Sequence, residues 1–336
     1  MRLCCCFILV TLASAASGEW KVSPDAMMTR WGKQVNPQNV WQEYPRPQFR
    51  REENWKNLNG LWQYGINQIN RIPQVYQGDI LVPFAVESAL SGVQRLLAPE
   101  ETLWYRRILR HQTPAGHRTH LHFEAVDYEC TVYLNGTKIG SHKGSSDPFK
   151  FDITDSLQAG ENELVVNVID QTAPSQTLGK QSLKPKGIYY TRVSGIWQTV
   201  WLEDVPERHF RMVKMKPRVA EGTLRVLPTL DGEPLEAERV VITVRDGERV
   251  VGTADAALSV RIPNAKLWSP QNPHLYEITM ELFDGEKLVD RVESYAAMRE
   301  VGTVRGPAGQ IRMTLNGKVV FHYGPLDQGW WPDGLL

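Results

Sequence analysis

The chain has 336 residues, 38 of them Lys or Arg and 38 Asp or Glu, which gives a formal net charge of zero. This length predicts two domains, each large enough to bury its own core. A neutral chain lacks the general attraction to phosphate backbones and anionic membranes that a basic one has, so nucleic acid is not an expected partner. With 42% hydrophobic and 23% charged residues, the composition also excludes a wholly disordered chain.

The first residues have the pattern of a secretory signal peptide. Arg2 precedes an apolar run from residue 3 to residue 13, and small residues of the A-x-A type follow, so cleavage is expected near residues 15–17. The run is too short to span a bilayer, which needs about 20 apolar residues. A lipid anchor on one of the three leader cysteines is the alternative. Cleavage predicts a secreted or periplasmic protein that keeps one cysteine, Cys130, and therefore has no internal disulfide.

Residues 18–50 read as an extended, proline-bearing arm that supplies no core. From residue 51 to residue 205, short runs rich in Val, Ile, Phe, Tyr and Trp recur about every ten residues between turn-forming residues, which is typical of an all-β sandwich. The apolar positions switch from odd to even numbers around residues 126–129, so a bulge or tight bend is expected there. Asn135-Gly136 predicts a two-residue hairpin turn. The same turn creates an N-glycosylation pattern, Asn-Gly-Thr, which its role in the hairpin is sufficient to explain.

Residues 206–301 contain about seven short alternating segments. Asp246-Gly247 and Asp284-Gly285 predict hairpin turns between neighbouring strands. This block fits an immunoglobulin-like sandwich without the cysteine pair of antibody domains. The remaining residues, 302–336, predict one hairpin around Asn316-Gly317, followed by a loop rich in Gly, Pro and Trp. Because its exposed indoles have no partner surface in the chain, the sequence is expected to be a truncated one.

The usual signatures of metal-dependent or serine-dependent hydrolysis are missing from the sequence. It contains no H-E-x-x-H, no G-x-S-x-G, no P-loop and no His or Cys pair at zinc spacing, so neither a metal nor a cofactor is expected. Asn162-Glu163 has the look of a glycosidase acid but sits beside a turn, where a structural role is favoured. Asp127 and Glu129 flank the parity switch, and exposed bend residues are favoured over cleft residues there.

Aromatic residues interleaved with Arg, Asn and Asp are what a sugar-recognising surface needs, because a sugar ring has an apolar face and many hydroxyls. Tyr189, Tyr190 and Arg192, ahead of the Gly195 turn, are the candidates for such a surface. Trp197 and Trp201 lie in an alternating strand and are expected in the core.

Several segments, in this order, resemble glycoside hydrolase family 2, which contains β-galactosidases, β-glucuronidases and β-mannosidases. They are residues 57–62 (NLNGLW), 103–107 (LWYRR), 132–136 (VYLNG), 147–149 (DPF), 160–162 (GEN) and 194–202 (SGIWQTVWL) in the first block. Residues 267–276 (LWSPQNPHLY) and 315–318 (LNGK) continue the match, which covers about residues 45 to 334.

The resemblance implies a jelly-roll sugar-binding domain, an immunoglobulin-like domain and the start of a TIM barrel. The family's retaining mechanism uses two carboxylates on later barrel strands, so no residue of this chain is assigned a catalytic role. Asp327 and Trp330 are expected to line the substrate pocket of a complete enzyme, with a hinge loop as the alternative. Asp147 is expected at the sugar cleft, with capping of the next strand as the alternative. Tyr189 stands where some family galactosidases carry an acid used at the sugar and a sodium ion, which disfavours that kind of enzyme.

Two functions remain open. In the first, the chain is the non-catalytic N-terminal part of an exported glycosidase that cleaves terminal β-linked sugars. In the second, it is a stand-alone carbohydrate-binding or adhesion protein. Both predict a carbohydrate or glycan as the partner and no membrane span. A scaffold role in a homo-oligomer is a third, weaker alternative.

Overall fold

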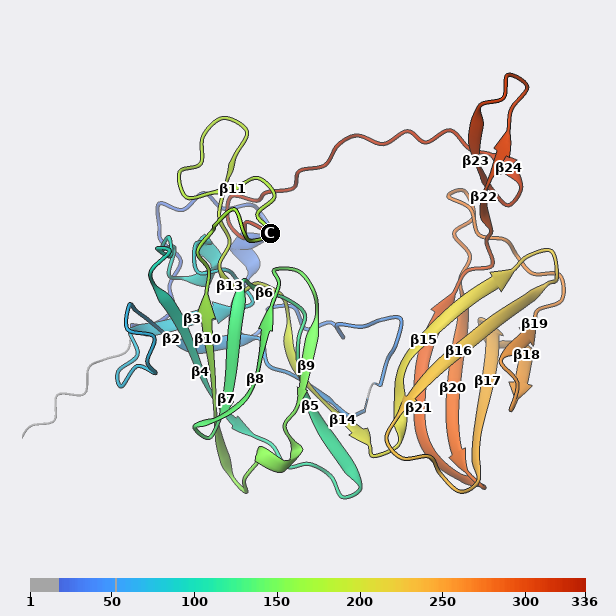
Figure 1. Ribbon diagram of the computed structural model, residues 1–336, viewed down its shortest axis with the longest axis horizontal. Helices are drawn as coiled ribbons and strands as arrows, with labels where there is room; N and C mark the ends of the chain where they lie inside the picture. The colour runs from blue at the N-terminus through green and yellow to red at the C-terminus, as the bar shows by residue number, and fades with distance from the viewer. Residues whose placement is uncertain (1–17, 52) are drawn as a thin grey trace, which may run out of the picture.

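The computed structural model describes residues 18–51 and 53–336 and is almost entirely β (Figure 1). Within these residues the only helices are three 3-10 turns, η1 (Gly32–Gln34), η2 (Ala89–Ser91) and η3 (Thr154–Ser156). The all-β prediction is therefore confirmed. None of these helices is long and apolar enough to cross a membrane. The expected signal peptide lies outside the described residues.

The first domain is a sandwich of two antiparallel sheets. The larger sheet has the order β3-β2-β4-β10-β7-β8 and the smaller one β1-β14-β5-β9. The larger contains β2 (Gly60–Asn67), β3 (Gly78–Val82), β4 (Thr102–Arg110), β7 (Glu129–Leu134), β8 (Thr137–Lys143) and β10 (Glu161–Ile169). The smaller contains β1 (Trp55–Asn57), β5 (His117–Phe123), β9 (Phe149–Asp152) and β14 (Val200–Pro206). Two short pairs, β11 (Gln181–Ser182) with β12 (Tyr190–Thr191) and β6 (Val126–Asp127) with β13 (Gly195–Ile196), complete the jelly roll.

The local turn predictions hold in this domain. The parity switch coincides with a break in the strands, where β6 ends at Asp127 and β7 begins at Glu129. Asn135 and Gly136 both have positive φ, 52° and 78°, as the predicted hairpin turn requires. The Asn135 side chain is engaged there, since its amide nitrogen donates to Ser156 and Asn162 and its oxygen accepts from the Glu163 amide.

Asn162-Glu163 is structural, as favoured. Asn162 is fully buried, and its side-chain oxygen accepts hydrogen bonds from the Gln158 amide and from Asn135. Glu163 forms an ion pair with Arg106, in which the two atoms are 2.5 Å apart.

Of the two tryptophans expected in the core, only one is there. Trp201 is fully buried, whereas Trp197 is half-buried at the edge of a surface hollow. Trp197 precedes β14 and so does not follow the in-out alternation of that strand. Its indole N–H donates to the Ser145 carbonyl at 2.7 Å.

The second domain has the seven strands expected of an immunoglobulin-like sandwich. One sheet has the order β15-β16-β19 and the other β18-β17-β20-β21. The strands are β15 (His209–Arg218), β16 (Thr223–Asp231), β17 (Glu238–Asp246), β18 (Arg249–Asp255), β19 (Ser259–Arg261), β20 (Tyr276–Asp284) and β21 (Lys287–Ala296). Gly247 and Gly285 adopt positive φ in the two predicted hairpin turns. Figure 1 shows the two sandwiches side by side, with β14 leading into β15 between them.

The expectation that the arm supplies no core is wrong. Val40 is 1% exposed and packs with Leu81, Phe84 and Leu90 of the first domain. Phe49 is 8% exposed and belongs to the core of the second domain. The arm is aperiodic, so single apolar residues that reach two different cores leave no pattern in its sequence.

The last segment begins with a small antiparallel sheet of β22 (Val301–Arg305), β23 (Ile311–Leu315) and β24 (Lys318–Val319). The hairpin predicted around Asn316-Gly317 is the one between β23 and β24. No parallel barrel strands are formed in the described part of this segment. Beyond β24 the chain crosses back to the first domain, as the red trace in Figure 1 shows.

Candidate functional site

The returning C-terminal segment docks on the loop that carries the predicted sugar-binding tyrosines. The ring of Tyr190, in β12, stacks on the Trp330 indole with 4.9 Å between ring centroids and 14° between planes. Its hydroxyl donates to the Gln328 side-chain oxygen at 2.6 Å, and the Lys180 amine donates to the same oxygen at 2.9 Å. Residues about 140 positions apart in the chain therefore form one surface.

Two other features make this surface suitable for a sugar. Tyr189 is 53% exposed beside Tyr190, and Asp327 is exposed next to Gln328. Aromatic rings and a carboxylate are groups that orient a hydroxyl-rich ring. The Trp330 indole N–H is buried, so it faces the protein and not the surface. We refer to Tyr189, Tyr190, Asp327 and Trp330 as the Tyr190–Trp330 surface.

The other two candidates are placed elsewhere. Arg192 is only 4% exposed, and its guanidinium donates to the Leu97 carbonyl and lies 3.9 Å from the Glu87 carboxylate. It thus supports the loop from beneath. Asp147 is exposed in the loop between β8 and β9, between two residues, Ser146 and Pro148, that line a separate hollow.

Buried acids lie beneath the loop. Glu87 accepts a hydrogen bond from the Ser194 amide at 2.9 Å, and Asp170 accepts one from the Ser194 hydroxyl at 2.8 Å. Burial raises the pKa of Glu87 to about 7. Burial, with the nearby charge of Asp170, raises the pKa of Asp127 to about 8. Asp127 is 5% exposed, so the favoured interpretation as an exposed bend residue is wrong for it, whereas Glu129 is exposed. The sequence marks Asp127 only as a bend candidate and contains no signal for Glu87 or Asp170, because remote segments bring these acids together only in the folded chain.

Replacing Asp127 with asparagine is expected to stabilise the protein in alkaline solution. A carboxyl whose folded pKa is raised stays protonated in the folded state while the unfolded state ionises, so its contribution to stability is lost as pH rises from about 4 to about 8. Asparagine cannot ionise, so the difference between variant and wild type should grow by roughly 3 kcal/mol from pH 5 to pH 8. Urea unfolding at both pH values measures this difference. Asp25→Asn, in the exposed arm, is the control, and equal behaviour of the two variants would contradict the prediction.

One group of side chains is close enough to hold a metal ion among the residues described. Ligand atoms of His120, His122 and Glu203 all lie within 4.8 Å of one another. Glu203, however, already accepts hydrogen bonds from Arg46 at 2.6 Å and from Arg51 at 3.1 Å. Guanidinium groups thus hold both carboxylate oxygens, and the group is better described as part of an ion-pair network at the domain boundary.

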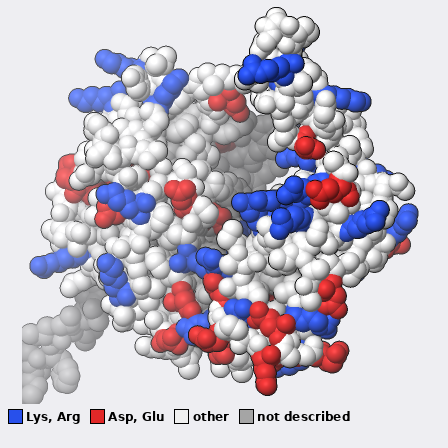
Figure 2. All heavy atoms as spheres, turned by 45° about the vertical axis from the view of Figure 1, so that its right-hand side comes forward, with Lys and Arg blue, Asp and Glu red and all other residues white. Residues whose placement is uncertain are grey.

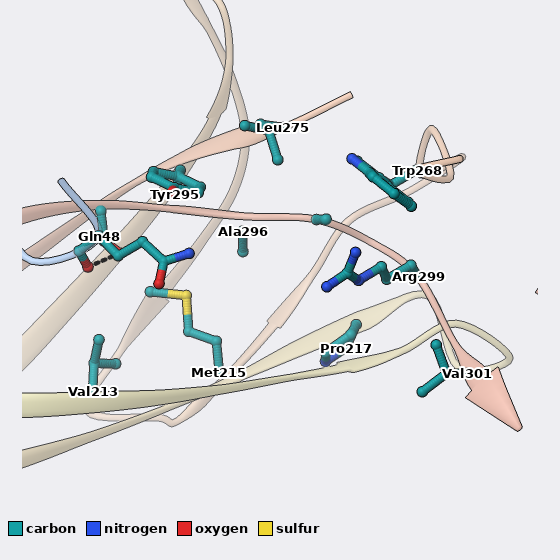
Figure 3. Close-up of a pocket in the computed structure, with 12 residues that line it drawn as sticks. Gln48, Val213, Met215, Pro217, Trp268, Leu275, Tyr295, Ala296, Arg299 and Val301 are labelled. Atoms are coloured by element: carbon teal, nitrogen blue, oxygen red, sulfur yellow. Dashed lines mark hydrogen bonds between the residues drawn. The ribbon is translucent and has the colours of Figure 1, made fainter. Parts of the chain in front are cut away.

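Two surface hollows differ in their lining residues. The first, of about 570 Å³, lies on the second domain where the chain leaves β21 for β22 (Figure 3). Its tryptophan, Trp268, has the Arg299 guanidinium 4.7 Å from its ring centroid, and the other lining residues are mainly aliphatic. The second hollow, of about 400 Å³, lies between the arm and the first domain and is lined by Trp41, Tyr44 and Trp197 together with two glutamates.

Charge is mixed over the surface. Figure 2 shows Lys and Arg side chains interspersed with Asp and Glu on one face, with a group of basic side chains beside its central hollow. This mixture agrees with the neutral overall composition.

Comparisons with known proteins agree with this architecture. Residues 93–206 match the family model described as glycosyl hydrolases family 2, sugar binding domain. Residues 216–299 match a second model, glycosyl hydrolases family 2. The two models lie on the two sandwiches and together match more than half of the chain.

Curated relatives include two β-galactosidases. One, from Halalkalibacterium halodurans, is 27% identical over 80% of this chain and 29% of its own length. The other, from Thermoanaerobacter pseudethanolicus, is 26% identical over 59% of this chain and 28% of its own length. The chain thus spans less than a third of either relative.

The fold is shared with solved β-glucuronidases. The enzyme of Ruminococcus gnavus, determined with D-glucuronic acid, aligns over 84% of this chain and 51% of its own, with a TM-score of 0.67 and 21% identity. An FMN-binding β-glucuronidase from Facaelibacterium prausnitzii L2-6 aligns over 79% of this chain and 41% of its own, with a TM-score of 0.62 and 23% identity.

Proposed function

The chain belongs to glycosyl hydrolases family 2, and from this premise we propose that its two domains are the non-catalytic, sugar-recognising part of a retaining glycosidase that acts on terminal β-linked sugars. The observation that carries the proposal is the Tyr190–Trp330 surface. It combines an aromatic stack and an exposed carboxylate at the point where the C-terminal segment returns to the jelly roll.

The chain's own acids support a binding role rather than a catalytic one. A retaining glycosidase needs two carboxylates about 5 Å apart on either side of the scissile bond. Glu87 and Asp127 have raised pKa values, as a general acid would, but both are buried beneath the loop. Glu87 also accepts hydrogen bonds from the Ser194 and Leu97 amides, so it holds the backbone in place. We assign neither of them a role in bond cleavage.

Export is also part of the proposal. It is supported by the leader pattern in the first 17 residues. Detection of the protein outside the cytoplasm, with residues 1–17 removed, would test it.

Replacing Trp330 with alanine is expected to weaken substrate recognition. In the protein expressed from its complete coding region, kcat/KM for 4-nitrophenyl β-glycosides should fall by about tenfold to a hundredfold, mainly through KM, because an aromatic stacking face is lost. Tyr190→Phe keeps the stack and loses only the bond to Gln328, so its effect should be smaller.

Tyr323→Ala is the matched control, because Tyr323 is 90% exposed on the same segment and makes no ring contact with the loop. The proposal fails if Trp330→Ala leaves KM unchanged, or if the complete protein hydrolyses no β-glycoside.

A further inference from the structure

The hollow between the arm and the jelly roll has the composition of a second sugar site. It lies where the arm crosses the end of the four-stranded sheet, beside the start of β14, and has a volume of about 400 Å³. The residues that matter to the argument are Trp41, Glu43, Tyr44, Glu124, Trp197 and Gln198, and we call it the Trp197 hollow. We propose that the Trp197 hollow binds a neutral sugar unit of an oligosaccharide. The matched family model describes residues 93–206 as a sugar binding domain but assigns no ligand to any of these residues, and the class of ligand rests on the proposed function.

Trp197 is the stacking platform. It is half-buried, and its N–H is used by the Ser145 carbonyl at 2.7 Å. The hydrogen bond fixes the indole plane while the ring borders the hollow. A fixed aromatic ring binds the apolar face of a sugar with little loss of side-chain entropy.

The arm supplies the opposite wall, and it is anchored. The Trp41 carbonyl accepts hydrogen bonds from the side-chain amides of Asn57 at 2.6 Å and Asn59 at 3.2 Å. The Tyr44 hydroxyl donates to the Glu203 carboxylate at 3.2 Å. These bonds fix the aromatic residues of the arm opposite the jelly roll before any ligand arrives, which lowers the cost of binding.

Hydrogen-bond acceptors for sugar hydroxyls are in place. Glu124 uses one carboxylate oxygen to accept from the Trp201 indole at 2.8 Å, which leaves its other oxygen for a ligand. Glu43 is exposed at the rim, and Gln198 adds an amide with both a donor and an acceptor. Carboxylates and amides beside aromatic rings match the paired hydroxyls of a pyranose.

The charge of the hollow selects against acidic sugars. Among the described residues that line it, two are glutamates and none is lysine or arginine. A uronic acid or a sulfated sugar would bring a like charge to these carboxylates. The hollow on the second domain lacks this combination, because the Arg299 guanidinium lies over its tryptophan, Trp268, and no carboxylate lines it.

The Trp197 hollow is separate from the Tyr190–Trp330 surface, since the two share no residue. Asp147 lies between Ser146 and Pro148, both of which line the hollow, but it does not line the hollow itself. Its assignment to a sugar cleft stays a prediction.

The experiment is calorimetric titration of the full chain with neutral oligosaccharides, namely β-linked gluco-, xylo-, manno- and galacto-hexaoses, and with an oligogalacturonide as the acidic probe. At least one neutral oligosaccharide should bind saturably, and the acidic one at least tenfold more weakly. Trp197→Ala should reduce the affinity at least tenfold, and Glu43→Gln, at an exposed position, about threefold to tenfold. Trp31→Ala, which removes an arm indole that is 55% exposed, is the matched control and should leave binding unchanged.

Glu43→Gln keeps the test valid if Trp197→Ala fails to fold. No binding of any neutral oligosaccharide, a preference for the acidic one, or loss of binding in Trp330→Ala but not in Glu43→Gln would each overturn the inference. The last result would leave the proposed function intact, whereas loss of hydrolysis in Trp330→Ala with normal oligosaccharide binding would support both proposals.

Discussion

Replacing Arg51 with methionine is expected to lower the free energy of unfolding by about 3–5 kcal/mol, because the buried Asp290 carboxylate loses its cation and buried Glu203 keeps only Arg46. Arg51 is 6% exposed at the end of the arm. Its guanidinium donates to the Asp290 carboxylate of β21 at 3.0 and 2.8 Å, to Glu203 of β14 at 3.1 Å, and to the Phe210 carbonyl at the start of β15.

These partners belong to both domains, so the side chain couples them. Glu203 lies in the smaller sheet of the jelly roll, and Asp290 lies in the immunoglobulin-like sandwich. An unpaired carboxylate costs far more free energy when it is buried than when it is exposed. Loss of Arg51 should therefore destabilise the contact between the two domains most.

Spectroscopy can separate the domains in this chain. Only one tryptophan, Trp268, lies in the second domain, so indole fluorescence reports mainly on the first domain and the arm. Circular dichroism reports on both domains. In urea, the two transitions of Arg51→Met should therefore separate, with a lower midpoint than in the wild type.

Arg239→Met is the matched control. Arg239 pairs with Asp255 at 2.9 Å, and both side chains are at least one-third exposed, so its loss should cost at most about 1 kcal/mol. Equal effects of the two substitutions would show that the Arg51 network does not link the domains.

The strands and turns of this protein were predictable because they depend on neighbours in the sequence. Alternation placed Leu121 and Phe123 on the inner face of β5, and both are fully buried. Asn135-Gly136 fixed a hairpin through its backbone preference alone. Such features need no knowledge of distant residues.

The buried charges were not predictable, because each depends on contacts between remote segments. Arg51 and Asp290 are 239 positions apart, and Asp127 lies beneath a loop that begins more than 40 residues later. A charged residue in an aperiodic arm or at a bend resembles a solvated one until the fold places it. The Tyr190–Trp330 stack was anticipated only as two separate candidates, since nothing in the sequence indicates that the C-terminal segment returns to the jelly roll. The expectation that the C-terminal indoles have no partner surface in the chain is wrong, because Trp330 stacks on Tyr190 and Trp331 packs against Trp31.

Replacing His122 with phenylalanine is expected to protect the protein against acid. His120 and His122 lie on the face of β5 opposite Leu121 and Phe123, toward the domain boundary. His122 stacks on Trp201 with 4.0 Å between ring centroids and an angle of 14°, a contact that phenylalanine can keep. His120 packs against His209 at 5.4 Å.

Burial lowers the pKa values of both histidines. The pKa of His120 falls to about 3, mainly through burial, with help from the Lys150 ammonium and the nearby imidazoles of His122 and His209, and against the opposing charge of Asp152. The pKa of His122 falls to about 4, against the opposing effect of Glu203, and Arg46 and Lys150 add to the decrease. The Arg51 guanidinium faces the same network through Glu203.

The direction of the pH effect on stability follows from proton binding in the folded and unfolded states. Below about pH 6.5 the unfolded state protonates these histidines while the folded state keeps them neutral, so stability is lost as pH falls toward 4. Removing one of these histidines should raise the free energy of unfolding relative to wild type by about 3 kcal/mol more at pH 4 than at pH 7. Urea unfolding of His122→Phe and of wild type at both pH values measures this difference. His322→Phe, at an exposed position, should show none.

The buried acids and the buried histidines act in opposite directions over the same range. Between about pH 4.5 and pH 6.5, the stabilising contribution of Glu87 and Asp127 falls as pH rises, whereas that of His120 and His122 increases. The free energy of unfolding of the wild type should therefore be nearly independent of pH in this range. In this range, the free energy of unfolding of Asp127→Asn should increase with pH, and that of His122→Phe should decrease with pH. If both variants keep the wild-type profile, the two sets of groups are not in the protonation states that their burial imposes.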